Sequence, residues 1–319
     1  MAQDPFFTWE GEVEIGVDSV FDSNIPGNEG KDPFLTIETA GEIALGENIT
    51  IFGGLTLEEM TGPSNSIEDL GLYIHELGVR IGNDMFSASF GKVTPTFGTA
   101  WDGAAGYFAS SILAEDYELT EVIGGTAAAD LGQAGTLEVG LFYFDDTALS
   151  RSAGFNRGKN RTAAGGAGNT GELNNVTVQW MKDFGNTSVH LGARHLSRGT
   201  GDLSDETGFV GGISHSFEGP GAPVDLFAEV ASFDGFGGTV DDAVYATISA
   251  AFTVGNTTFS AAASHRDIDS VGETDLFSFG IDHEFENGTT IGGALARVND
   301  VGGHDNVFGV SMIIPLGGD

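Results

Sequence analysis

Alternation of apolar and polar residues is the feature that most constrains how this chain can fold. From Phe7 to Asp18 the odd positions are apolar or Gly, and the even positions are mostly acidic. The same pattern recurs in the segments 35–45, 49–58, 176–181 and 277–285, whereas helical spacing is nearly absent. Successive side chains of a β-strand point to opposite faces. The chain is therefore predicted to be all-β, with one apolar and one polar face on each strand.

The alternating segments and the turns between them predict sixteen strands. Several of the short connections pair Asn with Gly or Asp, as at Asn83-Asp84, Gly255-Asn256 and Asn287-Gly288. Such residues close hairpins because they tolerate a positive φ. The predicted strands are 6–22, 33–45, 48–60, 70–82, 85–92, 117–129, 136–149, 173–183, 187–198, 207–218, 223–234, 242–253, 257–267, 274–286, 289–299 and 305–315.

The lengths of the connections alternate along the chain. Short turns follow every second strand, and the other links are mostly longer and polar, notably 93–116 and 150–172. An even number of strands, with short turns at one end and long loops at the other, is typical of bacterial outer-membrane barrels. No composition shift marks a linker. We therefore expect residues 1–319 to form a single transmembrane antiparallel β-barrel domain.

The charge of the chain narrows its function. Asp and Glu number 47 against 12 Lys and Arg, which gives a formal net charge of -35, and Cys is absent. A nucleic-acid partner is excluded because no basic face can be built. Buried unpaired carboxylates are very costly, so inward-facing ones indicate a water-filled interior rather than a dry core. The parity of the strands predicts these lumen-lining residues: Glu10, Glu12, Glu14, Glu38, Glu42, Glu58, Glu76, Asp225, Glu229 and Asp282.

The strand count, the long link after the fifth strand and the segment from Phe90 to Asp102 (Phe-Gly-Lys-Val-Thr-Pro-Thr-Phe-Gly-Thr-Ala-Trp-Asp) resemble the general porins of Gram-negative bacteria, particularly those of alphaproteobacteria. The resemblance implies a bacterial outer-membrane location, contact with lipid and lipopolysaccharide, and a homotrimer. It also implies that the segment 93–116 folds into the barrel and narrows it.

In such porins the carboxylates of the inward loop face basic residues on the opposite wall. By this resemblance Asp102, Glu115, Asp116 and Glu118 form the acidic side of the constriction. The basic side consists of Arg80, Lys92, Arg194 and Arg266. The alternative for each cation is that it pairs with a neighbouring carboxylate and only stiffens the wall.

We expect a porin that lets small hydrophilic solutes and ions diffuse, with a preference for cations, because acidic pore walls concentrate them. The alternatives are a channel selective for an organic acid or a siderophore, a barrel hydrolase, and a secreted acidic Ca²⁺-binding β protein. An enzyme is disfavoured because neither H-E-x-x-H nor G-x-S-x-G occurs. We expect no cofactor, although carboxylates near Asp234 and Asp241 leave loop-bound Ca²⁺ open. The basic segment 150–172 is either a solvated loop or a contact for lipopolysaccharide phosphates or a neighbouring subunit.

Overall fold

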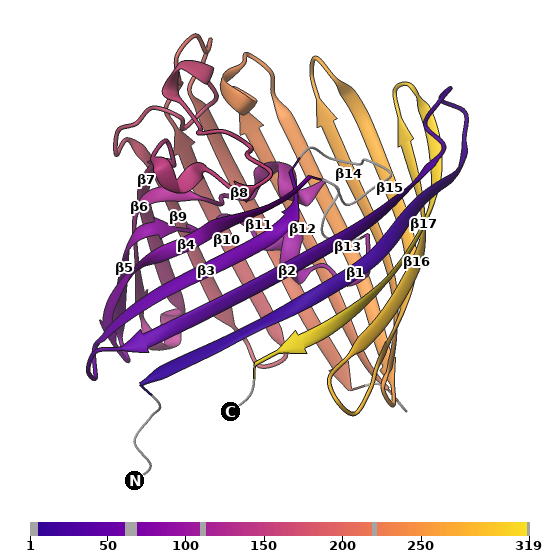
Figure 1. Cartoon of the computed structure of the whole chain (residues 1–319), viewed down its shortest axis with the longest axis horizontal. Helices are drawn as coiled ribbons and strands as arrows, with labels where there is room; N and C mark the ends of the chain where they lie inside the picture. The colour runs from indigo at the N-terminus through magenta and orange to yellow at the C-terminus, as the bar shows by residue number, and fades with distance from the viewer. Residues whose placement is uncertain (1–5, 61–68, 109–112, 219–221, 318–319) are drawn as a thin grey trace.

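The computed structural model describes residues 6–60, 69–108, 113–218 and 222–317. Sixteen long strands in this part of the chain form one closed antiparallel sheet (Figure 1). They are β1 (Phe7–Ser23), β2 (Gly30–Ala44), β3 (Ile49–Glu59), β4 (Leu70–Asn83), β5 (Phe86–Val93), β6 (Val122–Asp130), β7 (Thr136–Phe144), β9 (Asn175–Asp183), β10 (Thr187–Leu196), β11 (Glu206–Glu218), β12 (Pro223–Asp234), β13 (Ala243–Val254), β14 (Thr257–Ile268), β15 (Gly272–Glu284), β16 (Thr290–Asp300) and β17 (Gly303–Leu316). No helix among the described residues is long and apolar enough to cross a membrane.

The sheet closes because its first and last strands pair. β1 pairs with β2 on one side and with β17 on the other, for example Val13 with Ile37 and with Ile314. The short strand β8 (Ala153–Gly154) lies within the long link after β7 and pairs with β4, while β7 pairs directly with β9. β1 begins and β17 ends at the same end of the barrel, opposite the long loops (Figure 1). The predicted barrel of sixteen strands is therefore confirmed.

The two faces of the sheet follow the alternation. The outward set is exposed, with Trp9 at 47%, Leu55 at 42% and Phe279 at 71% of its surface, and Thr177 on the inner face is 1% exposed. A wall that is apolar outside and polar inside satisfies all its backbone groups through strand pairing, which is the condition for spanning lipid.

The hairpin turns use the residues expected. Gly255 and Gly288 adopt positive φ angles of 61° and 81°, which a residue with a Cβ adopts less readily. The Oδ1 of Asn83 accepts hydrogen bonds from the backbone N–H groups of Met85 and Phe86 at 2.9 and 3.1 Å. These short turns fix the register of the strands they join.

Two local details differ from the sequence prediction. The predicted strand 117–129 begins only at Val122, because the segment Ala114–Tyr117 forms a 3₁₀ turn. The alternating apolar residues Tyr117 and Leu119 are buried, so their alternation reflects packing of a loop and not a strand. A register shift in the pairing of β3 with β4, after Gly54, places both His75 and Glu76 at a bulge.

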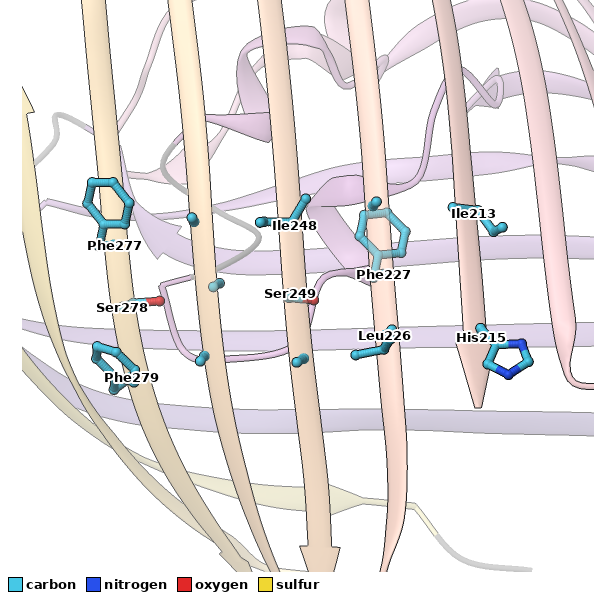
Figure 2. Close-up of a pocket in the computed structure, with 14 residues that line it drawn as sticks. Ile213, His215, Leu226, Phe227, Ile248, Ser249, Phe277, Ser278 and Phe279 are labelled. Atoms are coloured by element: carbon cyan, nitrogen blue, oxygen red, sulfur yellow. The ribbon is translucent and has the colours of Figure 1, made fainter. Parts of the chain in front are cut away.

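A depression of about 820 Å³ lies on the outer wall across β11 to β15. Figure 2 shows Ile213, Leu226, Ile248, Phe277 and Phe279 projecting from neighbouring strands around it. Most of its lining is apolar and belongs to the outward-facing set. This surface faces lipid, so a path through the barrel lies on the inner side of the sheet.

Candidate functional site

The link between β5 and β6 bonds to side chains on the inner wall of the barrel. Its short helix α1 (Ala100–Gly103) and its 3₁₀ turn η1 (Ala114–Tyr117) lie inside the ring of strands (Figure 1). Gly98 N–H donates to Gln179 Oε1 of β9 at 2.7 Å, and Ala105 N–H donates to Ser249 Oγ of β13 at 2.8 Å. The Tyr107 hydroxyl donates to Asp18 Oδ1 of β1 at 2.8 Å. The described parts of segment 93–116 thus cross the lumen, from one wall to another.

Glu229 of β12 is the main anchor of this loop. Its carboxylate accepts hydrogen bonds from Thr99 N–H at 2.7 Å, Ala100 N–H at 3.3 Å and the Tyr117 hydroxyl at 2.6 Å. His190 Nε2 lies 2.6 Å from the same group. Glu229 is 1% exposed, so the predicted lumen-lining carboxylate instead serves as a buried clamp. Charge-assisted hydrogen bonds in such a site are strong because water does not compete for them.

An aromatic cluster packs between the loop and the wall. It contains Phe97 and Tyr117 of the loop with Phe233 of β12 and Tyr245 of β13. The ring centroids of Tyr117 and Tyr245 are 5.1 Å apart. Although the lumen was predicted to be filled with water, the side of it that this cluster fills is dry.

Arg194 belongs to this dry side. Its guanidinium pairs with Glu206 at 2.7 Å, donates to the Tyr117 carbonyl at 2.6 Å and stacks on the rings of Phe97 and Phe233. With 5% of its surface exposed, Arg194 presents no charge to the open lumen. Its proposed place on the basic side of the constriction is corrected to that of a structural ion pair.

Lys92 is corrected in the same way. Its ammonium lies 2.6 Å from Glu121 Oε2 and 3.1 Å from Asp145 Oδ2, and its side chain is 0% exposed. Arg157 lies in the link between β7 and β9, residues 145–174, which we call the outer loop, and it also pairs with Glu121. Lys92, Glu121 and Arg157, which we call the loop clasp, therefore join the two ends of the inward loop. The sequence placed Lys92 correctly at the start of the loop but could not show its partners.

The other two predicted cations are paired but remain in contact with water. Arg80 lies 2.8 Å from Glu42, and both side chains are more than two-fifths exposed. Arg266 of β14 pairs with Asp116 of the loop at 2.9 Å. The pair of Arg266 with Asp116 joins two charges that the resemblance placed on opposing sides of the constriction. It leaves less positive charge free to balance the carboxylates around it.

The carboxylates of the loop lie beside carboxylates of the wall. The pKa of Glu115 is raised to about 7, first by its partial enclosure and then by the negative charges of Glu118, Glu58 and Asp116. The pKa of Glu118 is also raised, by enclosure first and then by Asp102 and Glu38. The wall residues Glu38 and Glu58 belong to β2 and β3. We call this set the facing carboxylates: Glu38, Glu58, Asp102, Glu115 and Glu118.

The remaining predicted lumen residues also follow the parity of their strands. On β1, Glu10, Glu12 and Glu14 alternate with residues such as the exposed Trp9 and Ile15. Asp18, on the inner side of β1, contacts the loop. Glu12 lies directly opposite Glu38 in the pairing of β1 with β2. Opposed like charges are tolerable where water screens them. This inner set comprises Glu10, Glu12, Glu14, Glu42, Asp225 and Asp282, while Glu76 lies opposite Gly54 at the bulge.

Three contributions were not found from the sequence. Tyr107, Gln179 and Arg157 hold the loop, and only contacts between distant strands reveal them. For metals, no group of three or more His, Asp or Glu side chains in the described ranges is placed to hold an ion. The site is thus an acidic passage beside an anchored loop.

A sequence profile described as Gram-negative porin matches residues 1–303. The chain belongs to the Gram-negative porin family. Its barrel, its outward apolar wall and its inward loop accord with that family. A search of curated proteins finds no match.

Solved structures similar to this porin are outer-membrane proteins. OprB of Pseudomonas putida has a TM-score of 0.70 at 9% identity, covering 97% of this chain and 94% of that chain. The channel DcaP of Acinetobacter baumannii has a TM-score of 0.66 at 12% identity, covering 97% of both chains. An anion-selective porin from Comamonas acidovorans has a TM-score of 0.62 at 12% identity, covering 97% of this chain and 99% of that one.

These likenesses establish the fold, and the family match establishes an outer-membrane channel of the porin class. The family is one of channels, which favours that function over the barrel hydrolase and the secreted acidic Ca²⁺-binding β protein. A porin described as anion-selective shares the fold. The fold alone therefore does not determine which ions this porin prefers. The ion preference depends on the charges in the lumen.

Proposed function

We propose that this porin conducts small hydrophilic solutes with a preference for cations, set by the facing carboxylates. The observation that carries the proposal is that the inward loop and the wall beside it are both acidic. The wall carboxylates Glu58 and Glu38 are close enough to Glu115 and Glu118 to contribute to the raised pKa values of these two loop residues. Carboxylates on both sides of a passage attract cations and repel anions.

The distribution of the cations supports the same proposal. Lys92 and Arg194 are buried in ion pairs, and Arg80 and Arg266 each have a carboxylate partner. Each ion pair has a formal charge near zero, so it adds little to the electrostatic field in the passage. The unpaired part of the lumen charge is then mainly negative.

The proposal is tested by neutralising the loop carboxylates. The double variant Glu115→Gln and Glu118→Gln is compared with a control double variant, Glu47→Gln and Glu286→Gln. The control removes the same amount of charge from exposed short turns, at the end of the barrel opposite the long loops. We expect the reversal potential in a KCl gradient to move toward zero in the first variant and to stay near the original value in the second. Equal reversal potentials in the two variants would place the selectivity elsewhere.

We also propose a homotrimer in contact with lipopolysaccharide. OmpT of Vibrio cholerae, described as a trimer, has a TM-score of 0.56 at 11% identity, covering 97% of this chain and 99% of that chain. On the outer loop, Arg151, Lys159 and Arg161 are exposed and suited to lipid phosphates. Native mass spectrometry in detergent should give a trimer mass, with lipopolysaccharide adducts that decrease when these three residues are changed to Gln.

A further inference from the structure

Arg157 links the outer loop, residues 145–174, to the inward loop. Its guanidinium Nη1 donates to Glu121 Oε1 at 2.8 Å, and Nη2 donates to Glu121 Oε2 at 2.5 Å. Its own position is fixed within the outer loop, since its Nε donates to the Ser150 carbonyl at 2.8 Å and its backbone N–H to Ser152 Oγ at 2.9 Å. A two-point contact of this kind fixes orientation as well as distance.

Glu121, the partner of Arg157, has an unusual backbone. Its φ of 52° is the one positive value among the non-glycine residues that the structure describes. Such a conformation persists where the surroundings hold it in place. Lys92 at 2.6 Å and Arg157 supply that hold at the point where the inward loop ends and β6 begins. Glu118, one of the facing carboxylates, lies shortly before Glu121 in the sequence.

Arg157 also contacts the barrel wall. Its guanidinium lies 4.1 Å from the centroid of the Tyr73 ring on β4. The Tyr73 hydroxyl donates to Glu58 Oε1 at 2.7 Å. One side chain of the outer loop therefore touches both the root of the inward loop and the residue that orients a wall carboxylate.

We propose that Arg157 is a positioning residue for ion selectivity, through which the outer loop fixes the facing carboxylates on both sides of the passage. The guanidinium of Arg157 is paired with Glu121, and the contribution that we assign to it is geometric. This inference rests on the proposed function, because it assigns a role to the same carboxylates.

The test separates geometry from charge. Arg157→Lys keeps the charge but cannot form the two-point contact, and Arg157→Gln removes both. Arg151→Gln is the matched control, since Arg151 is exposed on the same loop. The readouts are open-channel current noise, the pH midpoint of the reversal potential, and deuterium exchange of the amides in residues 113–121. Unheated gel migration reports that each variant has folded.

We expect both Arg157 variants to show increased noise and about tenfold faster amide exchange in residues 113–121, because the loop opens more often once the clasp is broken. In Arg157→Lys the pH midpoint should fall by about one unit, since Glu115 and Glu58 can then move apart. Arg151→Gln should match the unmodified porin in all three readouts.

The proposal would be overturned if Arg157→Lys matched the unmodified porin in current noise, in the pH midpoint of the reversal potential and in amide exchange. Equal effects of Arg157→Gln and Arg151→Gln on these readouts would overturn it too. Failure of the proposed function looks different: the unmodified porin would then show no cation preference, while noise and amide exchange would still report whether Arg157 holds the loop.

Discussion

Glu115 titrates near neutral pH, whereas carboxyl groups in water titrate near pH 4. Enclosure by the lumen, and then the charges of Glu118, Glu58 and Asp116, raise its pKa to about 7. A raised pKa means that this carboxyl is neutral below that pH and charged above it. At the scale of single residues, the selectivity of the channel is therefore expected to depend on pH in a range where most surface carboxylates do not change.

The cation preference should rise between pH 6 and 8, and most of this step should disappear in Glu115→Gln. Reversal potentials in a KCl gradient of about 0.1 M on the dilute side, where screening extends over about 10 Å, would reveal the step. A flat profile from pH 6 to 8 in the unmodified porin would contradict the assigned titration of Glu115.

The face of the sheet on which a residue lies could be predicted from the sequence, but its interaction partners could not. The parity of β1 and β2 correctly placed Glu12 and Glu38 on one face. Lys92 and Arg194 were predicted to line the constriction, but both are buried in ion pairs. Their partners Glu121 and Glu206 come from other elements, and no local pattern links a cation to a carboxylate on a distant segment.

At the scale of elements, the inward loop is held by a few buried polar groups. Glu229 accepts from two backbone N–H groups and from Tyr117, and replacing it leaves these donors without a partner. The sequence predicted that segment 93–116 enters the barrel from its length and position. It could not predict that Glu229, one of many acidic residues with the same parity, is the one that anchors the loop.

Glu229→Ala should release the loop and destabilise the folded barrel by about 3 kcal/mol, because buried donors lose a charged acceptor. We expect a larger and noisier single-channel conductance and a lower midpoint of thermal unfolding. Asp225→Ala on the same strand, whose side chain is exposed, is the matched control. Conductance that stays the same in both variants would show that the Glu229 anchor does not hold the loop in place.

At the scale of the whole molecule, the barrel depends on an apolar exterior and a polar interior. Strand alternation predicts this directly, since a shift of one residue would reverse every side chain of a strand. The strand count and the hairpin turns were predictable for the same reason. The bulge at His75 and Glu76 was not, because an extra residue in one strand is visible only against its partner.

Phe279→Arg should destabilise the barrel in lipid by about 2–4 kcal/mol, the cost of a cation on the lipid-facing wall near the middle of the membrane. Asp282→Arg, on the same strand but facing water, should cost much less. Urea-induced unfolding in lipid vesicles compares the two variants. A larger loss of stability for Asp282→Arg would reverse the assignment of the two faces.

We propose that the acidic lumen, and not its few paired cations, sets the ion preference of this porin. The most direct test is the sign of the reversal potential of the unmodified porin in a KCl gradient at pH 7 and low salt. We expect a sign that shows higher permeability to K⁺ than to Cl⁻, and a smaller effect at about 1 M salt, where the screening length shortens to about 3 Å. Higher permeability to Cl⁻ under the same conditions would contradict it.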